Sequence, residues 1–419
     1  MKKALENKIT LYFISSIIPF LAVSIFVAEL IYTSLGIFFL IYLIINKNFL
    51  IYKNIFFKLS IVFYIICVIS SLLSKEIFFS LKSSLPFLRF IIFISLICYL
   101  MHNSKEFTHL LYKFFYITFI LLILFGLADY ILKYNNLLIL NILDSSNIRL
   151  NLPFSDEQKL GSYLVRLYPL FLAIHIFKNN NSKKKNIYFL ILTLFASLII
   201  LLSGERNSLF FLILIFLSCF FLLNIQLKIK LSFFLLSFLA IFIILLFNNN
   251  LSKRIIFDKN NQFVFSKDQI IVFTPQHTAH YKTAFNMFLG SPYVGHGPKM
   301  FRISCSEKKY NSKVGEFTGC SNHPHSTYLQ LMAETGLVAA IIFSLGFFFI
   351  SFKLIKHFLN KLFYRKIYLN NYQITLCISA LIFFWPFSPA GNFFNNWLLI
   401  ISSFPIGFYV NEFFLKKNN

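Results

Sequence analysis

The sequence predicts an all-α polytopic integral membrane protein with about twelve transmembrane helices and one large loop outside the membrane. Of its 419 residues, 58% are hydrophobic and only 13% are charged, whereas an average soluble domain is about a quarter charged. The hydrophobic residues form long blocks, and Lys and Arg concentrate in the short stretches between them. This composition excludes intrinsic disorder and indicates that a bilayer surrounds most of the chain.

Apolar blocks long enough to cross a bilayer, which takes about 20 mostly apolar residues, make up most of the sequence. The predicted spans are residues 10–27, 30–46, 56–74, 84–101, 109–128, 160–177, 186–203, 207–224, 229–247, 325–351, 371–388 and 393–413. The first two spans meet at residues 28–30. We expect no cleavable signal peptide, because the first block is long and lacks a clear small-residue cleavage site.

Basic residues occupy alternate loops. With twelve spans, the Lys-rich stretches before the first span, after spans two, six, eight and ten, and after the last span all fall on one side. The positive-inside rule makes that side, with both termini, cytoplasmic in a bacterial inner membrane. This topology and contact with anionic membrane lipids account for the net charge of +24 without a nucleic-acid partner.

Two long loops, residues 129–159 and 248–324, then face the periplasm. We therefore divide the chain into three parts: residues 1–247 with nine spans and the first loop, residues 248–324 as the large periplasmic loop, and residues 325–419 with three spans. Loops of this length are usually functional or form a small domain. Five of the nine histidines lie in the large loop or directly after it, so we expect the chemistry there.

Cys305 and Cys320 lie in the large loop, which would be in an oxidising compartment. A disulfide between them could stabilise the fold by about 3 kcal/mol. The alternative is a zinc site of these two cysteines with His323 and His325, but the spacing matches no standard zinc pattern. We expect no metal and no cofactor, and we interpret the four cysteines within spans as packing residues.

Arg206 follows the turn Ser203–Glu205 at the outer end of the eighth span, where topology does not require positive charge. An arginine at the membrane edge can serve only as an anchor. Alternatively, its guanidinium and the amino end of the helix expected from about Asn207 form an anion site suited to phosphate.

The stretch Asn322–Gln330 leads directly into the tenth span. Ser326 is a good helix-start residue, and Ser326, Gln330 and Glu334 recur every four residues, so they share one helix face. Polar groups there are costly unless they line a cavity. His325 could act as a general base toward a sugar hydroxyl; the alternative is a capping segment with incidental histidines.

The stretch Pro292–Arg302 contains Gly295 and Gly297, which permit a tight turn, followed by Lys299 and Arg302, which could contact phosphate. Taken alone this is a weak signal, because most such turns only reverse the chain. The sequence contains no complete Rossmann or Walker A motif.

Together these features resemble the O-antigen ligase/O-antigen polymerase superfamily. That family often ends its major periplasmic loop with His-Pro-His-Asn-x-Tyr-Leu-Gln followed by Glu-x-Gly, and His323–Gly336 reads similarly here. The stretch Met287–Arg302, the two loop cysteines and the arginine before a span at Arg206 also resemble the family. As topology the resemblance covers most of the chain; as motifs it covers residues 277–336 and 203–208.

The resemblance implies a membrane-embedded, metal-independent, inverting glycosyltransferase that takes a glycan from undecaprenyl diphosphate. A ligase transfers the glycan to lipid A–core in lipopolysaccharide biosynthesis, and a polymerase transfers it to another carrier-linked repeat unit. In the family, outward arginines hold the diphosphate and the motif histidine activates the acceptor, which places these roles on Arg206 and His325. We expect a ligase, with a polymerase as the alternative.

Two departures from the family pattern matter. Ser326 stands where the family usually has Asn, so a side-chain amide contact is absent. Ligases also have another loop arginine near Tyr281–Phe288, and this chain has His277 and His280 instead. Either His280 makes a weaker, pH-dependent contact with the diphosphate, or Arg302 moves in.

The chemistry itself requires few groups. A diphosphate leaving group gains negative charge as the glycosidic bond breaks, and losing one fixed donor near such charge typically costs about 10²–10³ in rate. An inverting transfer needs one base and no covalent nucleophile. We expect His325 and Arg206 to be catalytic. The expected diphosphate contacts are Arg206, Arg302, His280 and Lys299, and the secondary candidates are Glu334, Gln330, His323, Arg89 and Arg166.

Other functions remain open. A small-solute transporter also commonly has twelve spans, but its site would lie at midspan near a repeat interface. This chain has no convincing internal repeat, and its charged span residues, such as Arg89 and Arg166, lie near outer ends. A non-catalytic scaffold for polysaccharide export would tolerate His325→Ala. A protein O-oligosaccharyltransferase is a rival within the class, and its members usually have extra sequence after the last span.

Overall fold

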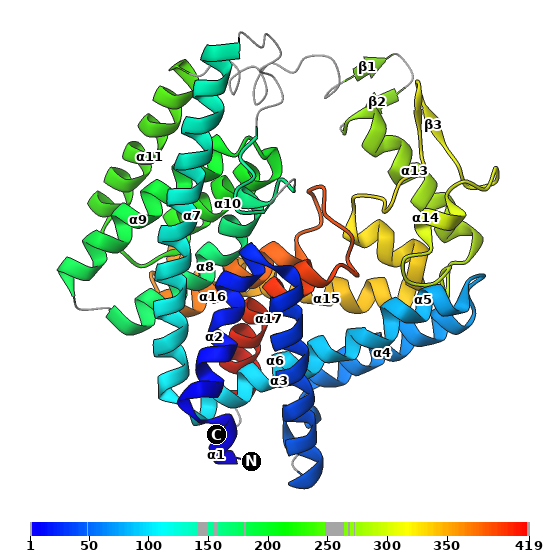
Figure 1. The fold of residues 1–419 in the computed structure, drawn as a ribbon, viewed down its shortest axis with the longest axis horizontal. Helices are drawn as coiled ribbons and strands as arrows, with labels where there is room; N and C mark the ends of the chain where they lie inside the picture. Colours follow the sequence, from blue (N-terminus) through cyan, green and yellow to red (C-terminus); the bar gives the residue numbers. More distant parts are fainter. Residues whose placement is uncertain are drawn as a thin grey trace.

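The computed structural model describes residues 2–47, 49–140, 149–154, 157–179, 182–247, 264–266, 269–271 and 273–416, and these are mostly helical (Figure 1). Parts of both predicted outer loops, residues 141–148, 155–156, 248–263, 267–268 and 272, lie outside the described residues. Within these described ranges, eight helical segments are long and apolar enough to cross a membrane, and three shorter apolar helices accompany them. The chain is therefore a multi-pass membrane protein; the count of twelve spans and their orientation stay predictions.

Each predicted span of residues 1–247 falls on helix. The helices are α1 (Lys2–Leu5), α2 (Lys8–Val23), α3 (Ile25–Ile45), η1 (Leu50–Lys53), α4 (Ile55–Leu72), α5 (Ile77–Ser84), η2 (Leu85–Phe87), α6 (Leu88–Asn103), α7 (Lys105–Leu140), α8 (Leu160–Asn179), α9 (Lys183–Leu202), α10 (Arg206–Leu222) and α11 (Leu227–Phe247). The predicted junction of the first two spans at residues 28–30 is wrong. The break lies at Ser24, whose hydroxyl accepts from Val27 N at 3.4 Å and so caps α3. Residues 129–140, expected in the first loop, extend α7.

The segment 273–326 holds two helices and a hairpin that the sequence did not predict. The helices are α13 (Pro275–Gly290) and α14 (Phe301–Ser304). Strands β1 (Val264–Ser266) and β2 (Gln269–Ile271) pair antiparallel, as do β3 (Lys313–Val314) and β4 (Phe317–Thr318). Helix α13 contacts the start of α15 and lies at the side of the molecule away from α9 and α11 (Figure 1).

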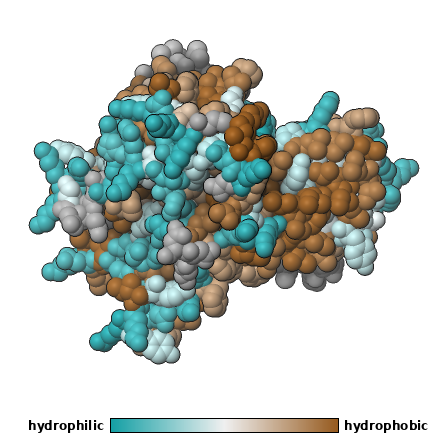
Figure 2. All heavy atoms as spheres, turned by 90° about the horizontal axis from the view of Figure 1, so that it is seen from below, coloured by the Kyte–Doolittle hydropathy of each residue, from teal (hydrophilic) through white to brown (hydrophobic). Residues whose placement is uncertain are grey.

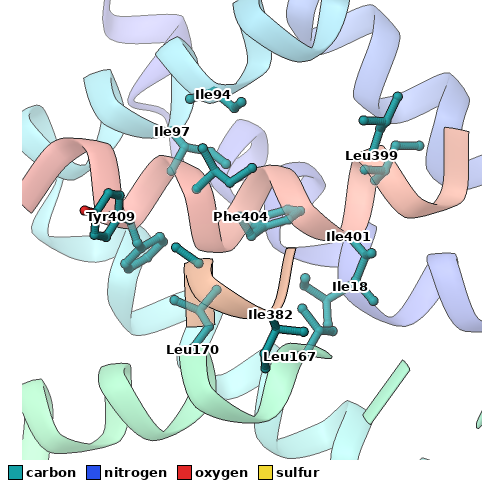
Figure 3. Packing of buried hydrophobic residues seen from close by; sticks show 14 of the residues in the cluster. Ile18, Ile94, Ile97, Leu167, Leu170, Ile382, Leu399, Ile401, Phe404 and Tyr409 are labelled. Carbon is teal, nitrogen blue, oxygen red and sulfur yellow. The ribbon is translucent and has the colours of Figure 1, made fainter. Parts of the chain in front are cut away.

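The last three helices form the centre of the fold. They are α15 (Thr327–Tyr364), α16 (Asn371–Phe384) and α17 (Asn396–Val410), and a short π-helix, η5 (Asn411–Leu415), follows. Every residue of α17 from Trp397 to Val410 is buried. In Figure 3, Ile94 and Ile97 of α6 lie on one side of α17, and Leu167 and Leu170 of α8 lie on the other.

The outer surface is strongly divided. In the face shown in Figure 2, hydrophilic residues gather in one half and hydrophobic residues form a broad patch in the other. Exposed large apolar side chains are frequent along α4 and α15, for example Ile65, Ile69, Phe348 and Phe352. Such exposure is expected where the surrounding solvent is hydrocarbon.

A break in α15 positions the candidate site. At Gly336 the backbone leaves the helical conformation, with φ 79° and ψ −179°. The carbonyls freed by the break accept from the loop before α14: His296 N donates to Ala333 O at 3.0 Å and Gly297 N to Glu334 O at 2.7 Å. In return, Leu337 N donates to Pro292 O at 2.8 Å. We call this contact of Pro292–Gly297 with Ala333–Leu337 the Gly336 junction.

Candidate functional site

His325 lies directly before α15 in a conformation that is rare for a side-chain-bearing residue. Its φ is 57°, in the left-handed region, where a non-glycine residue is strained by roughly 1–3 kcal/mol. Ala390 N donates to its carbonyl at 2.9 Å and fixes it to the loop between α16 and α17. The next residue, Ser326, caps α15 by accepting from Leu329 N at 3.4 Å, as its position in the sequence predicted. The backbone on both sides therefore holds the imidazole in place.

Four histidines gather at this point, and we call them the histidine cluster. The ring of His325 lies 4.1 Å from that of His323, 5.2 Å from that of His277 and 5.3 Å from that of His280, measured between centroids. His277 and His280 are three residues apart on α13, so they share one helix face. The predicted site contained the other three. His277 was missed as a site residue, although Thr274-Pro275 signals a helix start that sets this spacing.

The histidines of the cluster are neutral at pH 7. Burial, with the charges of the neighbouring histidines adding to it, lowers the pKa of His325 to about 3 and that of His280 to about 4. Burial likewise lowers the pKa of His277 and His323. A neutral His325 has a free lone pair and can accept a proton. His280 offers an anion a neutral hydrogen bond at this pH rather than a positive charge.

The two loop cysteines bracket part of this site. A disulfide joins Cys305, directly after α14, to Cys320, with the Cα atoms 5.0 Å apart. The sulfurs are bonded to each other, which leaves the alternative zinc site without its two thiolates. Among the described residues, no group of three or more His, Cys, Asp or Glu side chains is arranged to hold a metal ion.

Positive charge lies beside the cluster on the α14 side. Arg302 is exposed. Burial is the main cause of the lowered pKa of His323, and the positive charge of Arg302 adds to it. Burial and then the charge of Arg302 lower the pKa of Lys299. Lys299 also has a left-handed backbone, with φ 63°, at the end of the Gly297 turn. The sequence-predicted phosphate contacts Arg302 and Lys299 are thus neighbours of each other and of the cluster.

Gln330 and Glu334 connect the backbone segments around the cluster. Both side chains are fully buried. Glu334 Oε1 accepts from Phe301 N at 3.0 Å, and Gln330 Oε1 accepts from Phe393 N at 2.9 Å. They share one helix face, as the spacing predicted. That face binds two loops and does not line an open cavity.

Two further arginines, Arg166 and Arg206, lie in the first two turns of α8 and α10. Arg166 is within electrostatic range of Glu205, and a small pocket joins it to Thr327 and Ala390, which flank His325. Glu205 accepts from Gly161 N at 2.7 Å and from Ser162 N at 3.0 Å, which ties α10 to α8.

Arg206 begins α10, as the sequence predicted to within one residue. One turn later, the ring of Phe210 lies 5.9 Å from that of Trp385, in the loop that contacts His325. This end of α10 therefore borders the same loop as the histidine cluster.

Arg89 does not join the histidine cluster directly. Its Nη2 donates to Glu29 Oε1 at 2.7 Å and its Nη1 to Thr33 Oγ1 at 3.0 Å. Arg89 lies among the charged neighbours of Lys299, so the two face a common region on the α14 side.

A sequence model of the O-antigen ligase family matches residues 191–344, from α9 to the first part of α15. This range includes Arg206, α13, the disulfide, the histidine cluster and the Gly336 junction. The match confirms the resemblance to the O-antigen ligase/polymerase superfamily. No curated protein and no solved structure matches the chain.

Proposed function

We propose that the protein is an O-antigen ligase-type enzyme that transfers a glycan from undecaprenyl diphosphate to lipid A–core at the periplasmic face of the inner membrane. The observation that carries this proposal is a neutral, strained His325 in a cluster of neutral histidines, with cationic side chains on two sides. The family match supports a glycan-transferring enzyme in general. A small-solute transporter would instead have its site at midspan near a repeat interface.

In the proposed reaction, the acceptor hydroxyl oxygen attacks the anomeric carbon of the donor sugar. The bond from that carbon to the diphosphate oxygen breaks, and its electron pair leaves with the diphosphate. The hydroxyl proton passes to a ring nitrogen of His325. One displacement of this kind inverts the anomeric centre and needs no metal and no covalent intermediate.

The cations act on the leaving group. Arg206 holds the diphosphate from the α10 side, and Arg302 with Lys299 replaces the family's second loop arginine from the α14 side. A guanidinium suits phosphate because its planar fork can donate two parallel hydrogen bonds. His280, neutral at pH 7, contributes a hydrogen bond. Polymerisation of carrier-linked repeat units would use the same groups with a different acceptor, and the histidine in place of that arginine favours this alternative.

The test is transfer by purified protein in lipid, supplied with undecaprenyl-diphosphate-linked glycan, with or without lipid A–core. We expect His325→Ala to reduce the rate by at least about 10²-fold, the lower range for a general base. His296→Ala is the matched control, because this loop histidine is also half-buried but bonds to Met287 O at 2.9 Å, outside the cluster. Formation of glycan-bearing lipid A–core would establish a ligase. Formation of carrier-linked glycans of increasing length without lipid A–core would establish a polymerase. Equal rates for both variants and wild type would exclude His325 as the base.

A further inference from the structure

A polar pocket lies on the α14 side of the site, between α3, α5 and α6. Its volume is about 190 Å³, and its charged lining is Glu29, Lys82, Arg89 and Lys299. Three cations against one carboxylate leave a net charge of about +2. We call it the Arg89 pocket. An excess of positive charge in a confined pocket favours a phosphate-bearing ligand.

The anchor of this pocket is built into the fold. The side chain of Glu29 accepts from Arg89 and, at 2.7 Å, from Asn396 Nδ2, so that three helices, α3, α6 and α17, fix its position. Two hydrogen bonds, from Arg89 Nη2 to Glu29 and from Arg89 Nη1 to Thr33, hold the guanidinium at the wall of the pocket. Its positive charge is thereby fixed where a phosphate can contact it.

A second, apolar cavity adjoins the first. It has a volume of about 570 Å³, and Phe90 and Leu399 line both spaces. It runs between α4, α6, α15 and α17, from Phe393 beside the site to Phe414 near the end of the chain. The volume falls in the range of about 300–1,000 Å³ typical of ligand sites. Its walls are almost entirely aromatic and aliphatic, which suits a hydrocarbon chain.

We propose that the Arg89 pocket and the apolar cavity together bind a phosphate-bearing lipid, with its phosphate at Arg89 and its hydrocarbon chain between α4 and α15. Lys299 connects this pocket to the histidine cluster, because the charge of Arg302 acts on both Lys299 and His323. The site thus presents a second membrane-anchored substrate to His325. That role rests on the proposed function; the binding of the lipid does not.

The shared chemistry, a phosphate on a long hydrocarbon chain, has two sources: a polyprenyl phosphate carrier or a lipid A-type glycolipid. The binding experiment uses full-length protein in nanodiscs and native mass spectrometry with undecaprenyl phosphate, lipid A and undecaprenol, which lacks the phosphate. We expect wild type to bind at least one phosphate-bearing lipid at least tenfold more tightly than undecaprenol. Which of the two lipids binds identifies the source.

Two variants locate the binding. Glu29→Gln with Arg89→Gln removes both members of the ion pair, so that no buried charge is left alone, and we expect it to abolish the preference for phosphate. Ser60→Phe places a ring in the apolar cavity, and we expect it to weaken the binding of all three lipids about equally. Lys184→Gln is the control, because this exposed cation lies in the first turn of α9, and that helix lines neither cavity.

Two results would overturn the proposal: wild type without preference for phosphate, or a preference that survives in the double variant. His325→Ala should bind lipid like wild type, because its ring is outside the pocket. If lipid binding depends on Arg89 while His325→Ala retains full transfer activity, the proposed base is wrong and the lipid site stands.

Discussion

Gln330 and Glu334 lie one turn apart on α15, and Nε2 of Gln330 donates to Oε2 of Glu334 at 2.9 Å with both side chains fully buried. Through this pair, α15 holds the backbone of Phe301 at one end and that of Phe393 at the other. Arg302 follows the first contact directly. The pair therefore sets the position of Arg302 relative to His325 without contacting Arg302 or His325.

We expect Glu334→Gln to destabilise the protein by about 1–3 kcal/mol, because one of two buried donors then loses its acceptor. The exchanged double variant, Gln330→Glu with Glu334→Gln, should recover part of this loss; the bond from Gln330 Nε2 to Asn392 Oδ1 at 3.1 Å is not restored. In it, the amide at position 334 donates to the carboxylate at 330 and still accepts from Phe301 N. Thermal unfolding in detergent measures the stability of both variants. A double variant less stable than the single variant would contradict the hydrogen bond between positions 330 and 334.

Transfer should stay insensitive to mild acid. The active form of His325 is unprotonated, and its pKa of about 3 lies below the ordinary value of about 6.5. As the pH falls from 7 to 5 the ring remains neutral, so kcat/KM should stay nearly level and decline only at lower pH. A kcat/KM profile that falls with an apparent pKa near 6.5 would contradict a buried His325 with a lowered pKa as the base.

Gly336→Ala should inactivate the enzyme. The φ of 79° is strained for alanine, and the added methyl group would collide with the backbone carbonyl of Tyr293. We expect a loss of at least about 1–3 kcal/mol from the backbone conformation alone, which essentially only glycine adopts, together with loss of transfer. Gly36→Ala on α3 is the control, since nothing lies within 4 Å of its added methyl group. That change should be neutral or stabilising by up to about 1 kcal/mol.

Cys305→Ser with Cys320→Ser should lower the free energy of unfolding by about 3 kcal/mol, the value for a loop of about 15 residues. It should also reduce transfer, because the bond joins the segment of Arg302 to that of His323. Cys219→Ser on α10 provides a free-thiol control. Peptide mapping without reductant is the direct check, and recovery of both loop cysteines as free thiols would refute the pairing.

Most of the helical fold could be predicted from the sequence, because the length of an apolar block directly reports whether it can cross a bilayer. The break at Ser24 was misplaced by several residues, since apolar residues continue on both sides of it. The break at Gly336 could not be predicted in the same way. It depends on hydrogen bonds to Pro292–Gly297, about 40 residues earlier, and a local pattern does not contain that partner.

The site shows the same division. His323, His325 and the shared face of Gln330 and Glu334 follow from local spacing, and the structure places them together. The assignment of His277 and the separate environment of Arg89 required the tertiary arrangement of α13 and α3. The low pKa of His280 has the same origin, because it results from burial against elements distant in sequence.

The Gly336 junction is made by main-chain atoms: its three hydrogen bonds join backbone N–H groups to backbone carbonyls. Side-chain identity at His296, Ala333 or Leu337 does not enter these bonds, whereas the absence of a side chain at Gly295 and Gly336 does. The residues from α13 to the start of α15 are therefore joined to α15 by backbone bonds that another sequence can also form, together with the side-chain bond from Phe301 N to Glu334 Oε1. A chimaera that receives residues 273–326 from a relative should dock them correctly if Gly295, Gly336 and Glu334 are kept, so that this segment can be exchanged while the membrane helices stay unchanged.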